Sequence, residues 1–148
     1  MSSAFRRGDR GVSTVEFALV APLLILLLVG ILDVARGVNA YVTVANASRE
    51  GARYAMLSPS SPPSAIVSAA RARVVPLDPS QLTVSASYYD GATFRPWPSN
   101  GVPASSPQPN AVTIRVEVSY PWSAVSALIA QFFGTAPLTS SATVDTRR

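Results

Sequence analysis

Three residue types that carry much of protein chemistry are missing from this 148-residue chain. It has no cysteine and no histidine, and because all twelve basic residues are arginine it has no lysine either. Without cysteine and histidine there are no disulfides, no thiolate metal sites and no cysteine or Ser-His-Asp catalysis. Without lysine there is no Schiff-base chemistry and no phosphate-binding lysine loop. We therefore expect no catalytic residues, no cofactor and no metal site.

Charge is also scarce, since only 14% of the residues are charged, against roughly 25% in a typical soluble protein. The net charge is +4, and the first ten residues contribute two of these units through Arg6, Arg7 and Arg10 against Asp9. The other arginines are dispersed among acids and form no basic stripe, so we expect no nucleic-acid partner. We also expect no small-molecule substrate. The shortage of charge instead points to lipid or a protein surface.

One long apolar run is present, from Phe17 to Leu32 (FALVAPLLILLLVGIL). Together with residues 12–15 it reaches the roughly 20 residues that span a hydrocarbon core of about 30 Å. Its twelve Leu, Ile, Val and Phe residues favour insertion by about 4 to 7 kcal/mol. Pro22 and Gly30 are tolerated in transmembrane helices. We predict a transmembrane segment over residues 12–32.

Two other interpretations of this run are open. It could be a buried core helix of a soluble protein, or a signal peptide cleaved after Val38-Asn39-Ala40. A signal peptide seldom carries an acid inside this segment, and Glu16 immediately precedes Phe17. Glu16 is either wetted at headgroup depth or functional, because ionised residues near lipid are functional candidates.

The residues around Glu16 form a distinctive pattern. A basic leader ends in Gly11, and Val12-Ser13-Thr14-Val15-Glu16-Phe17 follows. This resembles the processing site of type IV prepilins, where a membrane aspartic peptidase cuts after Gly. Residues 16–24 (EFALVAPLL) and 44–55 (VANASREGARYA) are similar to the opening and the "A.REGAR.A" stretch of the TadE-like pseudopilins of the tight-adherence (Flp) pilus system.

The resemblance implies a processing site between Gly11 and Val12 and a subunit-interaction site at Glu16 and Phe17. Val12 would become the new N-terminus, and its amine would pair with Glu16 of a neighbouring subunit. Many type IV pilins have Phe where this chain has Val12, so N-methylation stays open. The implied partners are membrane lipid, a prepilin peptidase, pilin-like proteins and the pilus assembly platform.

The arginine bias places the N-terminus in the cytoplasm. We expect a single-pass protein of the bacterial inner membrane with its C-terminal head outside the cytoplasm, and its incorporation in the pilus is open. The expected parts are a leader (1–11), a continuous helix (12–57), a Pro/Ser linker (58–63) and a small α+β head domain (64–148). Within the helix, residues 12–32 would be transmembrane and 33–57 extramembrane.

The extramembrane part of this helix has an apolar stripe at steps of three and four residues. We expect the Ala-rich part of the stripe to pack on the head or on neighbouring subunits. Its members are Val34, Val38, Tyr41, Val42, Ala45, Ser48, Ala52, Ala55 and Met56.

The sequence of the head predicts an α+β domain with a small, mostly antiparallel three-stranded sheet. Ser64 is the expected N-cap of a helix through Val75. Alternating residues predict strands over 82–88, 111–120 and 140–146, with a turn at Asp90-Gly91 and a proline-rich loop over 95–110. Residues 123–133 form an apolar segment that is either helical or at the membrane surface.

Two further patterns in the head are candidate sites. Six aromatics suggest either a ligand platform or core packing: Tyr89, Phe94, Tyr88, Trp97, Tyr120 and Trp122. No spacing pairs two carboxylates for a hydrolase among Asp78, Asp90, Glu117 and Asp145. The expected function is that of a TadE-like pseudopilin or minor pilin that supports pilus assembly in adhesion or secretion. The alternative is a single-pass membrane-anchored envelope binding module that is not processed as a pilin.

Overall fold

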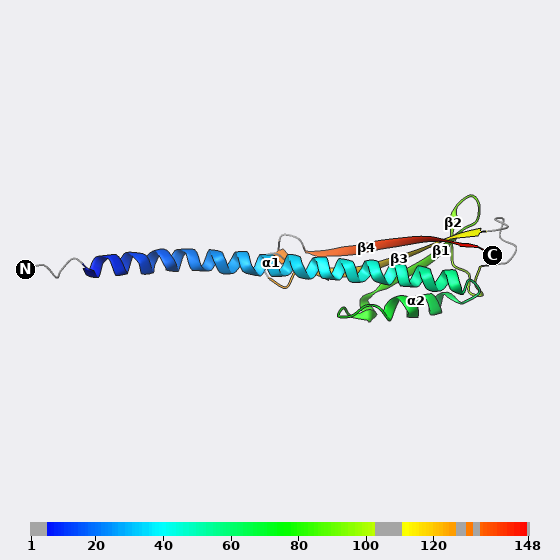
Figure 1. The fold of residues 1–148 in the computed structure, drawn as a ribbon, viewed down its shortest axis with the longest axis horizontal. Helices are drawn as coiled ribbons and strands as arrows, with labels where there is room; N and C mark the ends of the chain where they lie inside the picture. The colour runs from blue at the N-terminus through cyan, green and yellow to red at the C-terminus, as the bar shows by residue number, and fades with distance from the viewer. Residues whose placement is uncertain (1–5, 103–110, 127–129, 132–133, 148) are drawn as a thin grey trace, which may run out of the picture.

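The computed structural model describes residues 6–102, 111–126, 130–131 and 134–147, without the side chains of residues 6–10, 111 and 147. One long helix, α1 (Arg6–Leu57), extends from a small head at its C-terminal end (Figure 1). The first half of α1 stands clear of the head, and the second half lies along a sheet and a short helix, α2 (Pro63–Arg71). The chain is α+β, as the sequence predicts.

Helix α1 has 52 residues, which corresponds to roughly 78 Å at 1.5 Å per residue. It contains the predicted helix of residues 12–57 and begins six residues earlier. Pro22 lies inside it. In the described part of the chain, α1 is the one helix long and apolar enough to cross a membrane, and its most apolar stretch is covered by no part of the head.

The four strands are β1 (Thr83–Tyr89), β2 (Phe94–Pro96), β3 (Ala111–Ser123) and β4 (Thr135–Arg147). They form one antiparallel sheet in the order β2-β1-β3-β4. The predicted alternation in β3 is confirmed, because the four side chains at one face are fully buried: Val112, Ile114, Val116 and Val118.

The predicted count of three strands is wrong, because β2 lies at the start of the proline-rich stretch that was expected to be a loop. Its residue Pro96 pairs with Ser87 at the edge of the sheet. An edge strand tolerates proline, since the missing N–H would face away from the ladder. The expected turn at Asp90-Gly91 is confirmed, and it joins β1 to β2. The rest of the expected loop, residues 103–110, lies outside the described residues.

The N-cap predicted for the short helix is wrong. Helix α2 starts at Pro63 with Pro62 as its N-cap, because proline at the first helical position loses no hydrogen bond. It ends at Arg71 rather than near Val75. The Arg71 guanidinium donates to the carbonyl of Leu82 at 3.2 Å. Pro76 also disfavours helix in the residue before it.

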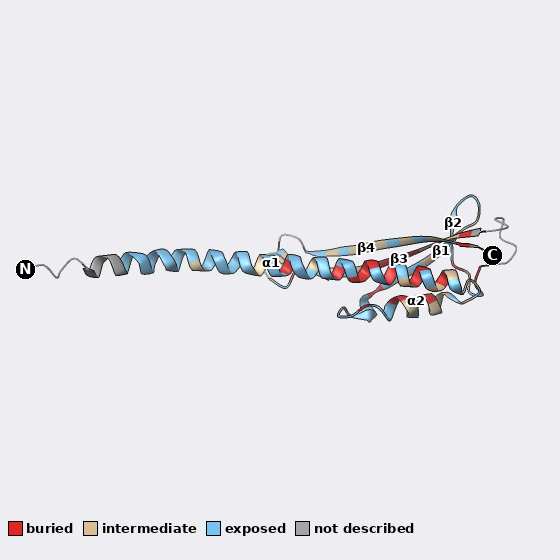
Figure 2. Cartoon of the chain, in the orientation of Figure 1, coloured by how far each residue is buried: buried red, intermediate tan, exposed pale blue. Residues whose placement is uncertain are grey.

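The core lies between α1, α2 and the inner face of the sheet (Figure 2). The face of α1 that enters it is rotated by about a quarter turn from the predicted stripe. Val34, Val38, Tyr41 and Val42 are exposed, whereas the Ala-rich end of the predicted stripe is buried. The buried face of α1 comprises Asp33, Ala40, Thr43, Val44, Ala45, Ala47, Ser48, Gly51, Ala52 and Ala55.

Small side chains explain this rotation. A Cβ on Gly51 would lie 3.0 Å from Cγ1 of Val116 in β3 and 3.4 Å from Cβ of Ala70 in α2. Such a close approach leaves no room for a valine or tyrosine at position 51, so the face with Gly51 and most of the alanines turns inward. The expected packing of the Ala-rich part on the chain's own head is therefore confirmed.

Candidate functional site

The residues of the expected processing and interaction sites lie together at the free end of α1. Val12 and Phe17 are each exposed by about two thirds (68% and 70%). A Cβ built on Gly11 meets no atom within 4 Å. Gly11, Val12, Glu16 and Phe17 are thus open to whatever surrounds the helix, whether lipid, an enzyme or another helix.

The spacing between Val12 and Glu16 is four residues, which places both on one face of α1. If the chain were cut after Gly11, the Glu16 carboxylate would be within reach of its own new amine as well as that of a neighbour. The geometry of a single chain therefore allows the pair within one subunit or between two.

A second cluster joins the head to the end of the apolar run. Asp33 is only 4% exposed although it directly follows Leu32. Its Oδ1 accepts the backbone N–H of Val125 at 3.1 Å, and its Oδ2 accepts that of Ser126 at 3.0 Å. One carboxylate thus satisfies two consecutive backbone donors just after β3. The only signal of this contact in the sequence is an acid next to a run without charges.

One turn beyond Asp33, α1 passes directly under an aromatic ring. A Cβ on Gly37 would lie 3.3 Å from Cζ2 of Trp122, near the end of β3. The absent side chain lets the indole pack close to the helix at Gly37. Asp33 and Gly37 therefore fix the same end of the sheet to α1, by hydrogen bonding and by close packing.

On the outer face of α1, Arg49 and Arg53 of this helix, together with Arg73 just after α2, contact Asn46 and Glu50. The Arg53 guanidinium is 3.4 Å from the Glu50 carboxylate, and Arg73 is 3.8 Å from the same carboxylate. Arg49 donates to Asn46 at 3.2 Å. Because Gly51, Ala52 and Ala55 point inward, the residues 44–55 singled out in the sequence form a packing face and a charged outer face.

The head's aromatics do not form a single platform. Trp97 is buried and donates from Nε1 to the carbonyl of Ser61 at 2.9 Å. Tyr89 and Phe94 contact each other across the β1–β2 hairpin with ring centroids 5.4 Å apart, and Arg115 covers Phe94. Trp122 lies at the other end of β3, against α1. These contacts are those of packing side chains.

The acids considered for catalysis are far apart or engaged locally. Asp90 accepts the N–H groups of Ala92 and Thr93 at 2.9 and 2.8 Å and pairs with Arg95. The Thr93 N–H, with the Arg95 guanidinium and the Ala92 N–H, holds the pKa of Asp90 far below its ordinary value. The same pair raises the pKa of Arg95.

Asp78 is engaged in the same way at the turn before β1. It accepts the Ser80 hydroxyl at 2.7 Å and the Ser80 N–H at 2.9 Å. These two hydrogen bonds lower the pKa of Asp78. Both aspartates therefore accept backbone hydrogen bonds within their own turns.

Glu117 and Asp145 belong to neighbouring strands but do not meet. The register places Asp145 opposite Thr113, four residues along β3 from Glu117, a separation of about 13 Å. Among the described residues there is also no group of three acids that could hold a metal ion.

Comparison with known proteins adds one finding. A family model described as TadE-like protein matches residues 11–53. No curated protein and no solved structure matches the chain. The matched residues run from Gly11 through the exposed apolar half of α1 to the ion pairs of its outer face. The resemblance recognised in the sequence is confirmed, and over residues 11–53 the chain is similar to TadE-like proteins.

Proposed function

We propose that this chain is a pseudopilin or minor pilin that supports assembly of a tight-adherence pilus. It is held in the inner membrane by residues 12–32, with its head outside the cytoplasm, and is processed between Gly11 and Val12. The observation that carries this function is the TadE-like segment in a helix whose apolar half the head leaves bare.

The bare half of α1 needs an apolar environment. Large side chains such as Leu19, Leu23 and Ile25 are 63–70% exposed, and a soluble monomer rarely exposes a contiguous apolar surface of this kind. Because these side chains surround the helix, a single protein partner would cover only part of them. Lipid, or a bundle of similar helices within lipid, fits better.

Beyond residue 32 the exposed stripe of Val34, Val38, Tyr41 and Val42 continues on α1 outside the head. These side chains are 50–65% exposed. Helices of other pilin-like proteins that pack along the bare half would reach this stripe without a break. The stripe therefore supports helix-to-helix assembly above the membrane as well as inside it.

Gly11 suits a cut at this point. Glycine costs a helix about 1 kcal/mol relative to alanine, so α1 opens more easily there than in the leucine-rich turns that follow. Its missing side chain also lets the chain enter a narrow cleft in an extended form. The Gly11–Val12 bond is uncovered by the head.

After the cut, Val12 carries an α-amine with a reference pKa near 8, which is positive at neutral pH. An ammonium and a carboxylate each stabilise the other where water is scarce. In the proposed assembly Glu16 receives the amine of a neighbouring subunit, and Phe17 lies beside it in the shared interface.

Mass spectrometry of the membrane-extracted protein tests the processing. We expect a mature chain that begins at Val12 in the wild type, and an uncut chain in Gly11→Leu. Val15→Leu is the matched control, since it adds bulk four residues away and should be cut normally. A wild-type chain that retains Met1 or Ser2, or that begins at Tyr41, would contradict the pilin function. Retention of the leader is the result expected of an unprocessed envelope binding module.

A further inference from the structure

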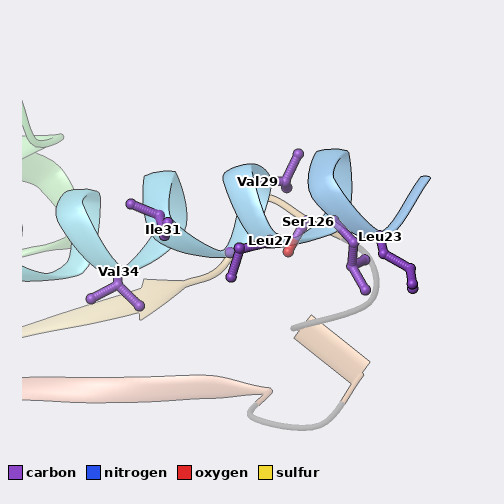
Figure 3. A pocket seen from close by; sticks show the side chains of 8 residues that line it. Leu23, Leu27, Val29, Ile31, Val34 and Ser126 are labelled. Carbon is purple, nitrogen blue, oxygen red and sulfur yellow. The ribbon is translucent and has the colours of Figure 1, made fainter. Parts of the chain in front are cut away.

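Two hollows beside α1 mark where its surroundings change from apolar to polar. The first is a groove that aliphatic side chains of α1 line as far as Val34 (Figure 3). The second has a volume of about 520 Å³ and begins at Arg36. Around the helix axis Asp33 lies between them, where it holds the start of the β3–β4 connection through the N–H groups of Val125 and Ser126. The change to polar side chains therefore falls within one turn of α1.

The second hollow lies at the depth of lipid headgroups if α1 spans the membrane. Arg36 is four residues beyond Leu32, the last residue of the apolar run, and Asn39 is seven. These separations correspond to about 6 and 10 Å along the helix. The headgroup layer is roughly 5–8 Å thick on each side of the hydrocarbon core. Arg36 therefore lies within this layer and Asn39 just outside it.

Three elements form this hollow, which we call the interfacial pocket. Two residues each come from α1, from the turn before β1 and from the end of β3: Arg36, Asn39, Asp78, Gln81, Tyr120 and Trp122. The turn is held by the hydrogen bonds of Asp78 to Ser80, and Trp122 packs against Gly37. The walls are thus fixed by contacts within the head, and the volume is in the range of small-molecule sites, roughly 300–1,000 Å³.

Two opposite charges line the interfacial pocket. The Arg36 guanidinium is always protonated and can only donate hydrogen bonds. Asp78 accepts the hydroxyl and N–H of Ser80 and the side-chain amide of Gln81, and these hydrogen bonds lower its pKa. Because a carboxylate has about four acceptor positions, Asp78 can accept one more donor. A purely anionic ligand would be repelled by Asp78 and a purely cationic one by Arg36, whereas a zwitterion suits both.

The aromatic side chains of the pocket suit the same kind of ligand. Tyr120 and Trp122 are half-buried, and such residues concentrate at the boundary between lipid and water. The face of an aromatic ring attracts an ammonium group. The Asn39 amide adds a neutral donor beside Arg36 on α1. A ligand with a phosphate and an ammonium would therefore find partners for both groups.

We infer that the interfacial pocket binds the phosphoethanolamine headgroup of a phospholipid. Its phosphate accepts hydrogen bonds from Arg36 and Asn39. Its ammonium donates to the Asp78 carboxylate beside the Trp122 ring, which a choline headgroup without N–H groups does not do. The inference rests on the proposed function only in requiring that α1 spans the membrane.

The two tryptophans of the chain allow a direct test by nuclear magnetic resonance of their indole N–H groups. Trp122 lines the pocket, whereas Trp97 lies in the core and donates to the carbonyl of Ser61 at 2.9 Å. The full chain in detergent micelles is titrated with short-chain phosphatidylethanolamine, phosphatidylcholine and phosphatidylglycerol, and with soluble phosphoethanolamine. We expect the Trp122 signal to shift saturably, at about a tenfold lower mole fraction of phosphatidylethanolamine than of the other lipids. The Trp97 signal should not move.

Variants of the two charged residues separate the two ends of the headgroup. Asp78→Asn keeps an acceptor for Ser80 and loses the charge, so the preference for ethanolamine over choline should fall to about twofold or less. Arg36→Gln should weaken the binding of both lipids about tenfold, since both carry the phosphate. Arg53→Gln is the matched control, because this exposed arginine of α1 lies outside the pocket. An unmoved Trp97 signal shows that the core of each variant is intact.

Four results would overturn the inference: no saturable shift of Trp122, equal responses to the three lipids, a preference for phosphatidylglycerol, or equally tight binding of soluble phosphoethanolamine. The last of these would assign the pocket to a soluble ligand. None of them affects the proposed function, because processing at Val12 is measured separately. Extraction of the chain from membranes by salt without detergent would instead contradict the span, and with it the proposed membrane protein.

Discussion

The two halves of α1 are both helical, but the head covers one of them and leaves the other exposed. Residues 12–32 present large aliphatic side chains around the whole helix, and the head covers almost none of them. Residues 33–57 place glycine, alanine and serine against β3 and α2, and keep charges on the outer face. The comparison shows that small side chains, more than apolar ones, mark the face of a helix that its own protein covers.

The largest effect should come from replacing glycine by leucine, a substitution that can be compared between the packed half of α1 and its free end. Gly51→Leu inserts a side chain where even a Cβ would lie 3.0 Å from Val116, and we expect the head to lose about 2–3 kcal/mol in free energy of unfolding. Gly11→Leu is the matched control, because nothing lies within 4 Å of its Cβ position. It should leave that free energy unchanged and block processing. Denaturant unfolding in detergent measures both, and equal stability of the two variants would remove the distinction between the halves.

The boundary between the halves is tested at Asp33. Asp33→Asn leaves one of the two backbone donors of Val125 and Ser126 facing an NH₂ group, and an unpaired buried donor costs about 2 kcal/mol. We expect faster hydrogen exchange at these two amides and little change at the core of β3. The control is Asn46→Asp, which changes an exposed amide of α1 to an acid. Unchanged exchange in Asp33→Asn would show that the carboxylate does not hold the connection.

A substitution at Glu16 tests the role of the exposed apolar half of α1. If it receives the amine of a neighbour's Val12, Glu16→Gln keeps the shape and loses the charge, at about 1–2 kcal/mol when the cost of breaking a buried pair is discounted for water access. This would weaken association several-fold to about thirtyfold. Cleavage after Gly11 should persist, so the variant is processed but crosslinks poorly to pilin-like partners. Normal crosslinking and piliation would mean that Glu16 is only hydrated at the depth of the lipid headgroups and receives no amine.

The smallest effect lies outside α1, at the β1–β2 turn. Its hydrogen bonds lower the pKa of Asp90 in the folded state, so Asp90 stabilises the fold above its ordinary pKa of 3.8 and progressively less below it. Asp90→Asn should therefore lower the midpoint of unfolding slightly at pH 7. The difference from the wild type should shrink as the pH falls below about 4. A difference that stays constant with pH would assign the effect to packing rather than charge.

The sequence predicts those parts of the molecule in which local signals agree. An uninterrupted apolar run followed by steps of three and four residues indicates α1, and strict alternation indicates β3 with Val112 and Val116 inside. Strand β2 could not be predicted, because Phe94–Pro96 becomes a strand only through pairing with β1. Propensity alone places prolines in loops.

For the site, the sequence indicates residues but not their surroundings. Gly11, Val12, Glu16 and Phe17 follow from a motif, and their exposure on α1 is compatible with the roles proposed for them. The role of Asp33 could not be predicted, because its partners lie more than ninety residues away and are backbone groups. The stripe that contains Val34 and Val38 and the buried face of α1 point in directions about a quarter turn apart around the helix axis. Periodicity alone does not decide which of the two faces is buried.

The continuity of α1 gives the molecule the mechanics of a lever. The helix has no break between Leu32 and Leu57, so a tilt of the lower part is carried to the upper end. A tilt of about 20°, which is average for transmembrane helices, would displace Leu57 sideways by about 13 Å. Because Asp33 and Gly37 fasten the sheet to the base of this arm, we expect the head to move with it. If residues 12–32 span a membrane, we expect a push or pull on them to move the whole head.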